Sequence, residues 1–164
     1  MWQQLIEKKM FDSYKNVSHV IAAWQYFGEK IVFTNGCFDI LHQGHLSYLM
    51  QAKELGGKLV IGLNNDISIK AIKGNNRPIN PQESRAFLLA SLSFVDAVIL
   101  FEEETPVRLI EQVRPAILVK GSDYAGKTIA GAEFVKSYQG EVILLDFLPN
   151  HSTTSIVEKI QSLK

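Results

Sequence analysis

Short apolar runs alternate with segments of helical periodicity along most of this chain, and this alternation constrains its fold more than any other feature. Helical segments between strand-like runs are typical of a parallel sheet with helices on both faces. The sequence therefore predicts one α/β domain built on a doubly wound parallel sheet. In such sheets, ligands bind beyond the carboxyl ends of the strands. The apolar runs that predict strands are 31–34, 58–63, 96–101, 116–119 and 141–145.

The first of these runs leads into residues 35–45, which carry the clearest chemical signal in the chain. Asn35-Gly36 ends the strand, and Gly44 opens a segment of helical periodicity. His42 and His45 therefore flank a glycine where a strand hands over to a helix. The first turn of a helix presents free N–H groups and the positive end of the helix dipole, so a phosphate can bind there. Histidine donors at this position can stabilise the charge that develops during phosphoryl or nucleotidyl transfer.

Composition and charge exclude several classes of protein. With 164 residues, of which 46% are hydrophobic and 21% charged, the chain is long enough for one domain with a substantial core. Its 17 basic residues balance 17 acidic ones, so no general field attracts nucleic acid or an anionic membrane. No apolar run approaches the length of a membrane span, and the N-terminus lacks the features of a signal peptide.

The single cysteine, Cys37, excludes an internal disulfide and fits a reducing compartment. We interpret Cys37 as a packing residue rather than a nucleophile. We therefore expect a cytoplasmic protein that has neither nucleic-acid nor membrane partners.

Residues 1–28 carry no visible chemistry. Val17, Ile21 and Trp24 have helical spacing, so the sequence predicts one or two short helices here. We expect this N-terminal helical segment to pack against the sheet or against a second subunit, and its apolar character favours a homodimer. Residues 29–164 then form the domain that carries the site.

Polar residues at the ends of later runs add to the site. Lys73 and Arg77 lie in a polar loop, residues 73–78, where they either hold a phosphate or form a solvated basic loop. Lys120 ends a buried strand at the ligand edge of the sheet, which favours a nucleotide role. Ser152 begins the last helix, so it caps that helix, binds phosphate, or does both.

Three further positions have two interpretations each. Arg85 lies on a predicted helix and is either a ligand contact or a surface ion-pair partner. Asp39 either fixes its loop or binds a ligand. Glu102 belongs to a run of acidic residues, and it either accepts hydrogen bonds from sugar hydroxyls or lies on a solvated edge.

Residues 121–128 match a competing motif, the P-loop pattern G-x-x-x-x-G-K-[ST], directly after a predicted strand. This motif would make the chain a P-loop NTPase or kinase, with Lys127 on the phosphates. A P-loop lysine opens a long helix, however, and Ile129-Ala130-Gly131 precedes any helical pattern here. We therefore favour the site at residues 35–45.

The stretch Gly36–His45 closely resembles the G-x-F-D-x-x-H-x-G-H signature of the nucleotidylyltransferase superfamily. Several further short motifs, named at the end of this paragraph, resemble motifs that occur in the same order in the adenylyltransferase half of bacterial ADP-heptose synthases. The resemblance implies a Rossmann-like fold and the transfer of AMP from ATP to D-glycero-β-D-manno-heptose 1-phosphate, a step towards the lipopolysaccharide core. It also implies Mg²⁺ carried on the ATP phosphates, since no cluster of protein metal ligands is evident. These further motifs are Thr34–Gly36, Lys73-Gly74, Arg77–Asn80, Phe101–Glu103 with Thr105-Pro106, Leu118–Gly121 and Ser152–Thr154.

The residues and the resemblance together give the expected site, which takes ATP and a sugar 1-phosphate and in which no residue is assigned to a metal. The expected catalytic residues are His42, His45 and Lys73; the expected nucleotide-binding residues are Asn35, Gly36, Cys37, Phe38, Gly44, Arg85, Lys120, Gly121, Asp123, Ser152, Thr153 and Thr154; and the expected substrate-binding residues are Asp39, Arg77 and Glu102.

Glycerol-3-phosphate cytidylyltransferase is the nearest rival within the superfamily. Its C-terminal run is usually R-T-x-G-x-S-T-T, whereas residues 147–154 of this chain keep the hydroxyls and lack the arginine and the glycine. This departure counts against CTP and glycerol 3-phosphate, and it leaves open whether His151 does part of the arginine's work. An inactive nucleotide-binding module is a further alternative, and the retention of His42 and His45 argues against it.

Overall fold

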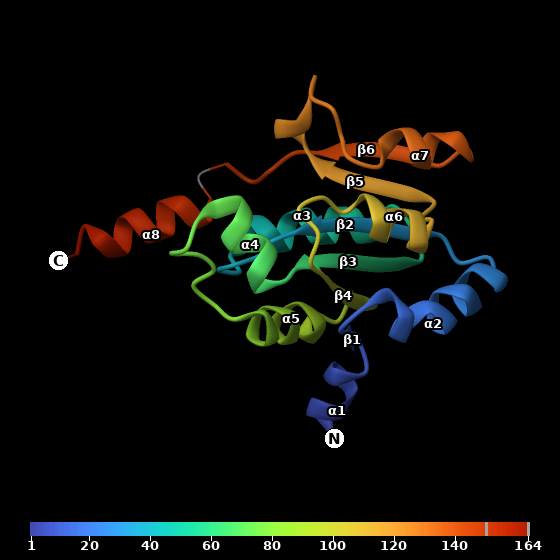
Figure 1. Ribbon diagram of the computed structural model, residues 1–164, viewed down its shortest axis with the longest axis horizontal. Helices are drawn as coiled ribbons and strands as arrows, with labels where there is room; N and C mark the ends of the chain where they lie inside the picture. Colours follow the sequence, from blue (N-terminus) through green and yellow to red (C-terminus); the bar gives the residue numbers. More distant parts are fainter. Residues whose placement is uncertain (150, 164) are drawn as a thin grey trace.

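The computed structural model describes residues 1–149 and 151–163, so Asn150 and Lys164 of the expected domain lie outside the described residues. A sheet of six parallel strands forms its centre, in the order β1-β4-β3-β2-β5-β6 (Figure 1). The predicted doubly wound parallel sheet is thereby confirmed. The strands are β1 (Met10–Phe11), β2 (Ile31–Gly36), β3 (Lys58–Asn64), β4 (Ala97–Phe101), β5 (Ile117–Gly121) and β6 (Glu141–Leu145).

Helices cover both faces of the sheet. They are α1 (Trp2–Glu7), α2 (Tyr14–Tyr26), α3 (Gln43–Glu54), α4 (Asp66–Lys73), α5 (Gln82–Ser91), α6 (Val107–Val113), α7 (Ala132–Ser137) and α8 (Thr153–Gln161), with a 3-10 turn η1 (Ser122–Tyr124). One core packs α3 and α5 on the sheet through side chains such as Leu49 and Leu89. The other core packs α2, α6 and α7 through Val17, Ile110 and Val135. In Figure 1, α8 extends away from the body of the molecule. None of the described helices has the length and apolar character that a membrane span requires.

Residues 1–28 hold the two predicted helices, α1 and α2, and also a strand that the sequence does not predict. This strand, β1, pairs in parallel with β4, with Met10 opposite Val98. A run of two residues is too short to show a strand periodicity, so its pairing depends on the tertiary fold. Val17 and Ile21 of α2 are completely buried against the sheet. The N-terminal segment therefore shares the core of the residues that follow it.

The order of the strands fixes where a ligand can bind. From β2 the chain moves outward to β3 and β4, and it then returns to place β5 on the other side of β2. At such a switch point, the loops that leave the two central strands diverge and open a crevice between them. β2 ends at Gly36 and β5 ends at Gly121, so the histidine motif and Lys120 both belong to this crevice.

Candidate active site

The loop after β2 and the start of α3 hold the two histidines of the motif side by side. His42 is the N-cap of α3, and its Nδ1 accepts a hydrogen bond from the backbone N–H of His45 at 3.4 Å. The two imidazole rings stack, with centroids 3.8 Å apart and planes inclined by 21°. A Cβ on Gly44 would approach the His42 ring to 3.1 Å and the Cβ of His151 to 2.9 Å. The glycine therefore lets α3 begin directly against the segment that precedes α8.

Burial keeps both histidines neutral near pH 7. Burial, followed by the charges of His42 and Lys73, lowers the pKa of His45 to about 4. Burial and the nearby His151 also lower the pKa of His42. Among the described residues, Nδ1 of His45 is buried without a hydrogen-bond partner. Because a neutral imidazole still carries one N–H, the pair offers donors to a phosphate without adding positive charge at this helix end.

Phe38 packs against the histidine pair from the strand side, and Asn35 links the end of β2 to β5. Phe38 is 8% exposed, and its ring lies edge-on against His45, with ring centroids 5.1 Å apart. Its backbone φ is +43°, a left-handed conformation that turns the chain out of the strand. Asn35, at the end of β2, accepts a hydrogen bond through Oδ1 from Nζ of Lys120 at the end of the neighbouring strand β5.

Lys120 brings a buried positive charge to the crevice. Its side chain is 6% exposed, and burial lowers its pKa to about 8, against the opposing charge of Asp123 in η1. Its hydrogen bond to Asn35 involves a neutral amide, which does not neutralise the ammonium group. An anionic ligand at the crevice would compensate the cost of burying this charge. Lys120 therefore lies at the ligand edge of the sheet, and its nucleotide role stays a prediction.

Lys73 and Cys37 lie beside the histidines. Lys73 is the last residue of α4, and its charge acts on both His45 and Cys37. Burial raises the pKa of the Cys37 thiol, and the charges of Lys73 and Arg85 offset only part of this effect. A thiol that remains protonated is a poor nucleophile, which agrees with the interpretation of Cys37 as a packing residue.

Asp39 fixes the loop before α5. Its Oδ1 accepts hydrogen bonds from the backbone N–H groups of Ile79 (2.8 Å) and Asn80 (2.9 Å), and its Oδ2 accepts one from Arg77 (2.9 Å). Burial alone would raise the pKa of Asp39, but these three donors outweigh it and hold the pKa below its usual range. Of the two interpretations that the sequence allows, these hydrogen bonds support loop fixation, and a substrate contact by Asp39 stays a prediction. The same ion pair draws Arg77 towards the motif loop.

Arg85 is the clearest correction to the expected site. Its side chain is fully buried, and the guanidinium donates to the carbonyl oxygens of Cys37 (2.7 Å), Asn64 (2.9 Å) and Asn80 (3.0 Å). It also forms an ion pair with Asp66 at 2.7 Å. Because no surface of this side chain is exposed, Arg85 neither touches a nucleotide nor forms a surface ion pair. It joins the loops after β2 and β3 to the start of α5, and thereby positions the site.

Glu102 lies apart from the histidines. It follows β4, which is separated from β2 by β3, and its side chain is exposed. Together with Glu103, Arg108 and residues of the N-terminal segment, it lines a cavity of about 490 Å³. The lining of this cavity includes no residue of the motif 36–45. A substrate contact by Glu102 therefore stays a prediction.

The P-loop interpretation is wrong. After Gly121 the chain makes the turn η1, and the next helix, α7, begins only at Ala132. Lys127 is exposed, its Nζ lies 5.9 Å from the centre of the Tyr124 ring, and it opens no helix because the residues between it and Ala132 are not helical. Gly121 instead makes room for the ring of Phe147, because a Cβ at this position would collide with that ring.

The start of α8 completes the crevice. Oγ of Ser152 accepts a hydrogen bond from the backbone N–H of Ser155 at 3.0 Å, so the predicted cap is confirmed. Thr153 and Thr154 form the first turn, where free N–H groups favour an anion. His151 precedes the cap and lies against Gly44, so the beginnings of α3 and α8 meet.

Phe147 is a residue that the sequence analysis does not assign to the site. It occupies the position of the missing arginine, and its ring stacks on that of Tyr48 with centroids 5.6 Å apart. Tyr48 is held in turn by a buried hydrogen bond between its hydroxyl group and that of Thr34, at 2.8 Å. Phe147 itself is 46% exposed. The signal that could have identified it is an aromatic residue two positions after the predicted strand 141–145, where the cytidylyltransferase run has its arginine.

Comparison with known proteins agrees with this geometry. The cytidylyltransferase-like family model matches residues 33–159. "Bifunctional protein HldE" of a Nitratiruptor species is 58% identical over 135 residues, and that of Campylobacter fetus subsp. fetus is 56% identical over 134 residues. Each alignment covers 82% of this chain and 28% of the relative. The chain thus spans little more than a quarter of the length of these curated relatives.

Two solved structures share the fold. The lipopolysaccharide core biosynthesis protein from Thermoplasma volcanium is 30% identical, with a TM-score of 0.58, and the alignment covers 74% of this chain and 98% of that one. Pantoate-beta-alanine ligase from Francisella tularensis is 17% identical, with a TM-score of 0.56 and coverage of 93% and 77%. The second likeness concerns the fold alone.

Proposed function

Because this chain belongs to the cytidylyltransferase-like family of nucleotidyltransferases, we propose that it transfers AMP from ATP to D-glycero-β-D-manno-heptose 1-phosphate, releasing ADP-heptose and pyrophosphate. The relatives named HldE, at more than half identity over the matched region, support a sugar-phosphate adenylyltransferase. The structure from Thermoplasma volcanium, whose name places it in lipopolysaccharide core biosynthesis, supports the same pathway.

The observation that carries the proposal is the stacked, neutral histidine pair at the start of α3, beside the buried ammonium group of Lys120. In the proposed reaction, an oxygen of the acceptor phosphate attacks the α-phosphorus of ATP, and the bond from that phosphorus to the bridging oxygen of pyrophosphate breaks. Negative charge then grows on the non-bridging oxygens and on the leaving group. His42 and His45 would donate N–H groups to this charge, and Lys120 would bind a phosphate oxygen.

Mg²⁺ belongs to the substrate in this proposal, as part of the ATP complex. The described residues contain no group of three or more His, Cys, Asp or Glu side chains placed to hold a metal ion. The carboxylates of Asp39 and Asp66 near the crevice are already engaged by Arg77 and Arg85. These residues do not fit a metal site held by the protein, so no step is assigned to one.

The segment before α8 supports ATP over CTP. Where the cytidylyltransferase run has an arginine, this chain places the ring of Phe147 on Tyr48 and over Gly121. An apolar ring at this point cannot provide the donors of a guanidinium group. We infer that the substrates are ATP and heptose 1-phosphate, each preferred at least about tenfold in kcat/KM over CTP and glycerol 3-phosphate.

Pyrophosphate release from all four combinations of these substrates tests the proposal. We expect the fastest release with ATP and heptose 1-phosphate. Fastest release with CTP and glycerol 3-phosphate would replace the named substrates and keep the histidine mechanism. Tight nucleotide binding without pyrophosphate release from any pair would identify an inactive binding module instead.

A further inference from the structure

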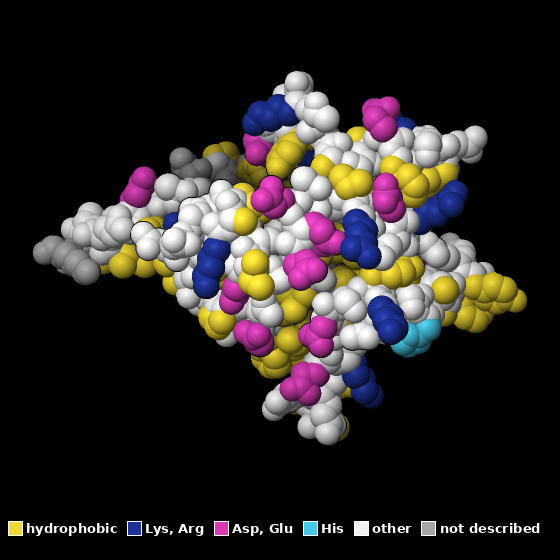
Figure 2. All heavy atoms as spheres, viewed as in Figure 1, with side chains coloured by type: hydrophobic (Ala, Val, Ile, Leu, Met, Phe, Trp, Pro, Cys, Tyr) yellow, Lys and Arg dark blue, Asp and Glu magenta, His cyan; other side chains and the backbone are white. Residues whose placement is uncertain are grey.

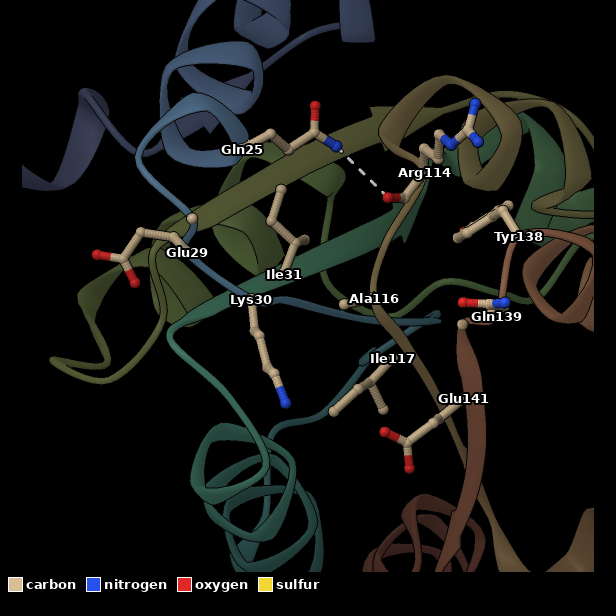
Figure 3. A pocket seen from close by; sticks show the side chains of 12 residues that line it. Gln25, Glu29, Lys30, Ile31, Arg114, Ala116, Ile117, Tyr138, Gln139 and Glu141 are labelled. Atoms are coloured by element: carbon tan, nitrogen blue, oxygen red, sulfur yellow. Dashed lines mark hydrogen bonds between the residues drawn. The ribbon is translucent and has the colours of Figure 1, made fainter.

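The base of a nucleotide must bind close to the crevice, because a single ribose joins it to the α-phosphate. A cavity of about 580 Å³ lies too far away to receive it. This cavity opens at the amino ends of β2, β5 and β6, where Ile31 and Glu141 line it (Figure 3). The 6 residues of β2 separate it from the histidine motif by roughly 20 Å.

A second cavity, of about 490 Å³, has the wrong charge for a nucleotide. Three acidic side chains line it, those of Asp12, Glu102 and Glu103, against two basic ones, those of Lys15 and Arg108. Figure 2 shows acidic side chains gathered on the face of the molecule that carries α4 and α6. Such a surface disfavours an anionic ligand. The base therefore has to bind on residues of the crevice itself.

The ring of Phe147 stands at this crevice with one face covered and the other open. One face stacks on Tyr48, with centroids 5.6 Å apart and planes inclined by 28°. One edge lies against Gly121, the last residue of β5. Phe147 is nevertheless 46% exposed, whereas Tyr48 is 6% exposed. The exposed surface of Phe147 therefore belongs to the face that points away from Tyr48.

The buried partner fixes this ring relative to the histidines. Tyr48 lies on α3 one turn after His45, and residues so spaced on a helix are about 5–6 Å apart. The Tyr48 hydroxyl is held by its buried hydrogen bond with Thr34 of β2. The open face of Phe147 is thus a rigid apolar platform at a short distance from the histidine pair.

A hydrogen-bond acceptor lies beside the platform. Asp123 in η1 is exposed, so its carboxylate is accessible to a ligand. A Cβ on Gly121 would lie 2.6 Å from Oδ1 of Asp123 and would also collide with the Phe147 ring. The carboxylate and the ring therefore adjoin the same point at the end of β5. Because an ionised carboxylate only accepts hydrogen bonds, it favours an amino group on a base over a carbonyl oxygen.

We propose that Phe147 and Asp123 select the nucleotide: adenine stacks on the open face of Phe147, and its 6-amino group donates a hydrogen bond to Asp123. This inference rests on the proposed function and names the two residues of the site that recognise the base. Stacking on an aromatic side chain accepts every base, and its strength differs between bases. A purine, with two fused rings, covers more of Phe147 than a pyrimidine does.

The two contacts predict an order of affinity among four nucleotides. ATP makes both contacts. CTP keeps the amino group but has a single ring, and ITP keeps the two rings but has a carbonyl oxygen in place of the amino group. UTP lacks both features. ATP should therefore bind roughly tenfold or more tightly than CTP or ITP, and UTP should bind most weakly.

Calorimetric titration of the full chain with Mg²⁺ and each nucleotide, without an acceptor, tests the stacking contact. Phe147→Leu keeps an apolar side chain on Tyr48 and removes the aromatic face, so the dissociation constant for ATP should rise roughly tenfold. Tripolyphosphate has no base, and its affinity should stay unchanged. Phe147→Trp should restore ATP binding. Trp2→Leu is the matched control, because Trp2 is 76% exposed on α1, far from β6 (Figure 1).

Asp123→Asn tests the hydrogen bond. The amide of asparagine can turn to donate to the carbonyl oxygen of ITP. Because the loss of a negative charge should strengthen the binding of every nucleotide, the measurement is the ratio of the ATP and ITP affinities. This ratio should fall roughly tenfold, whereas the ratio of the ATP and CTP affinities should not change. Glu133→Gln, at a side chain that is 94% exposed on α7, should change neither ratio.

Equal losses of ATP and tripolyphosphate binding in Phe147→Leu would show that the ring is only structural, and would overturn the inference. Unchanged ATP binding in Phe147→Leu, or a wild-type ratio of ATP to ITP in Asp123→Asn, would overturn it as well. Pyrophosphate release separates this result from the proposed function. Fastest release with ATP and a different acceptor overturns the proposed function alone, because no acceptor is present in the titrations.

Discussion

The guanidinium of Arg85 and the carbonyl oxygen of Cys37 are joined by a hydrogen bond of 2.7 Å across 48 positions of sequence. This contact ties the first turn of the histidine motif to a helix on the sheet's surface. The same side chain also donates to the carbonyl oxygen of Asn64 at the end of β3 and to that of Asn80 in the loop before α5. One buried cation therefore sets the relative positions of three loops. The histidines depend on Arg85 although it touches neither of them.

Replacing Arg85 should therefore destabilise the fold strongly. Arg85→Ala leaves Asp66 and three carbonyl oxygens without their donor, which should lower the free energy of unfolding by about 3–5 kcal/mol. Urea denaturation measures this change. Arg108→Ala is the control, because the Arg108 side chain is 74% exposed and lies 3.6 Å from Glu103. An exposed pair of this kind contributes about 1 kcal/mol or less. Equal losses in both variants would contradict the positioning role of Arg85.

The histidines should affect turnover and leave stability almost unchanged. His42→Ala or His45→Ala removes a donor to the transition state, so kcat should fall roughly 100-fold or more. Steady-state pyrophosphate release measures this effect, and the melting temperature should move little. Wild-type turnover in both variants would disprove the proposed mechanism.

Lys120 and Lys127 form a matched pair, since both ammonium groups lie near the Tyr124 ring, at 5.4 and 5.9 Å from its centre. Only Lys120 is buried at the crevice. Lys120→Ala should lower kcat/KM by about tenfold or more, as expected for a lost hydrogen bond from a charged group, and Lys127→Ala should have little effect. In the wild type, phosphate binding should weaken as the pH rises through about 8, where Lys120 loses its proton. A larger loss of kcat/KM in Lys127→Ala than in Lys120→Ala would instead place the site at the P-loop-like segment.

The low pKa of His45 predicts a pH dependence of stability. In the folded chain this pKa is about 4, whereas the ordinary value is 6.5, so the unfolded state binds more protons between these limits. The free energy of unfolding should therefore fall as the pH is lowered from 6.5 to 4. His45→Asn should flatten this slope in urea titrations at several pH values. His19→Asn, at an exposed position on α2, is the control. An unchanged slope in His45→Asn would show that His45 is not the group responsible.

The sheet and the motif are predictable because their signals are local. Apolar runs such as 58–63 become buried strands, and the segment 35–45 lies where a strand meets a helix. Strand β1 escapes prediction, since two residues carry no periodicity and only pairing with β4 defines them.

The function of Arg85 escapes prediction for a different reason. An arginine on an amphipathic helix normally faces solvent, and its actual acceptors are backbone carbonyls from distant loops that no residue pattern reveals. The contact of His151 with Gly44 is likewise hidden in the sequence, because it depends on how the last helix returns to the third.

The pairing of β2 with β5 also bears on how the chain is made. β2 carries the histidine motif, yet one of its two neighbours in the sheet, with Leu118 opposite Phe33, is synthesised 85 residues later. We expect a nascent chain released before β5 emerges to expose the unpaired edge of β2, together with the unfinished crevice. Incomplete nascent chains would then be the form most prone to aggregate. Chaperones that cover exposed strand edges would matter most between the synthesis of β2 and the synthesis of β5.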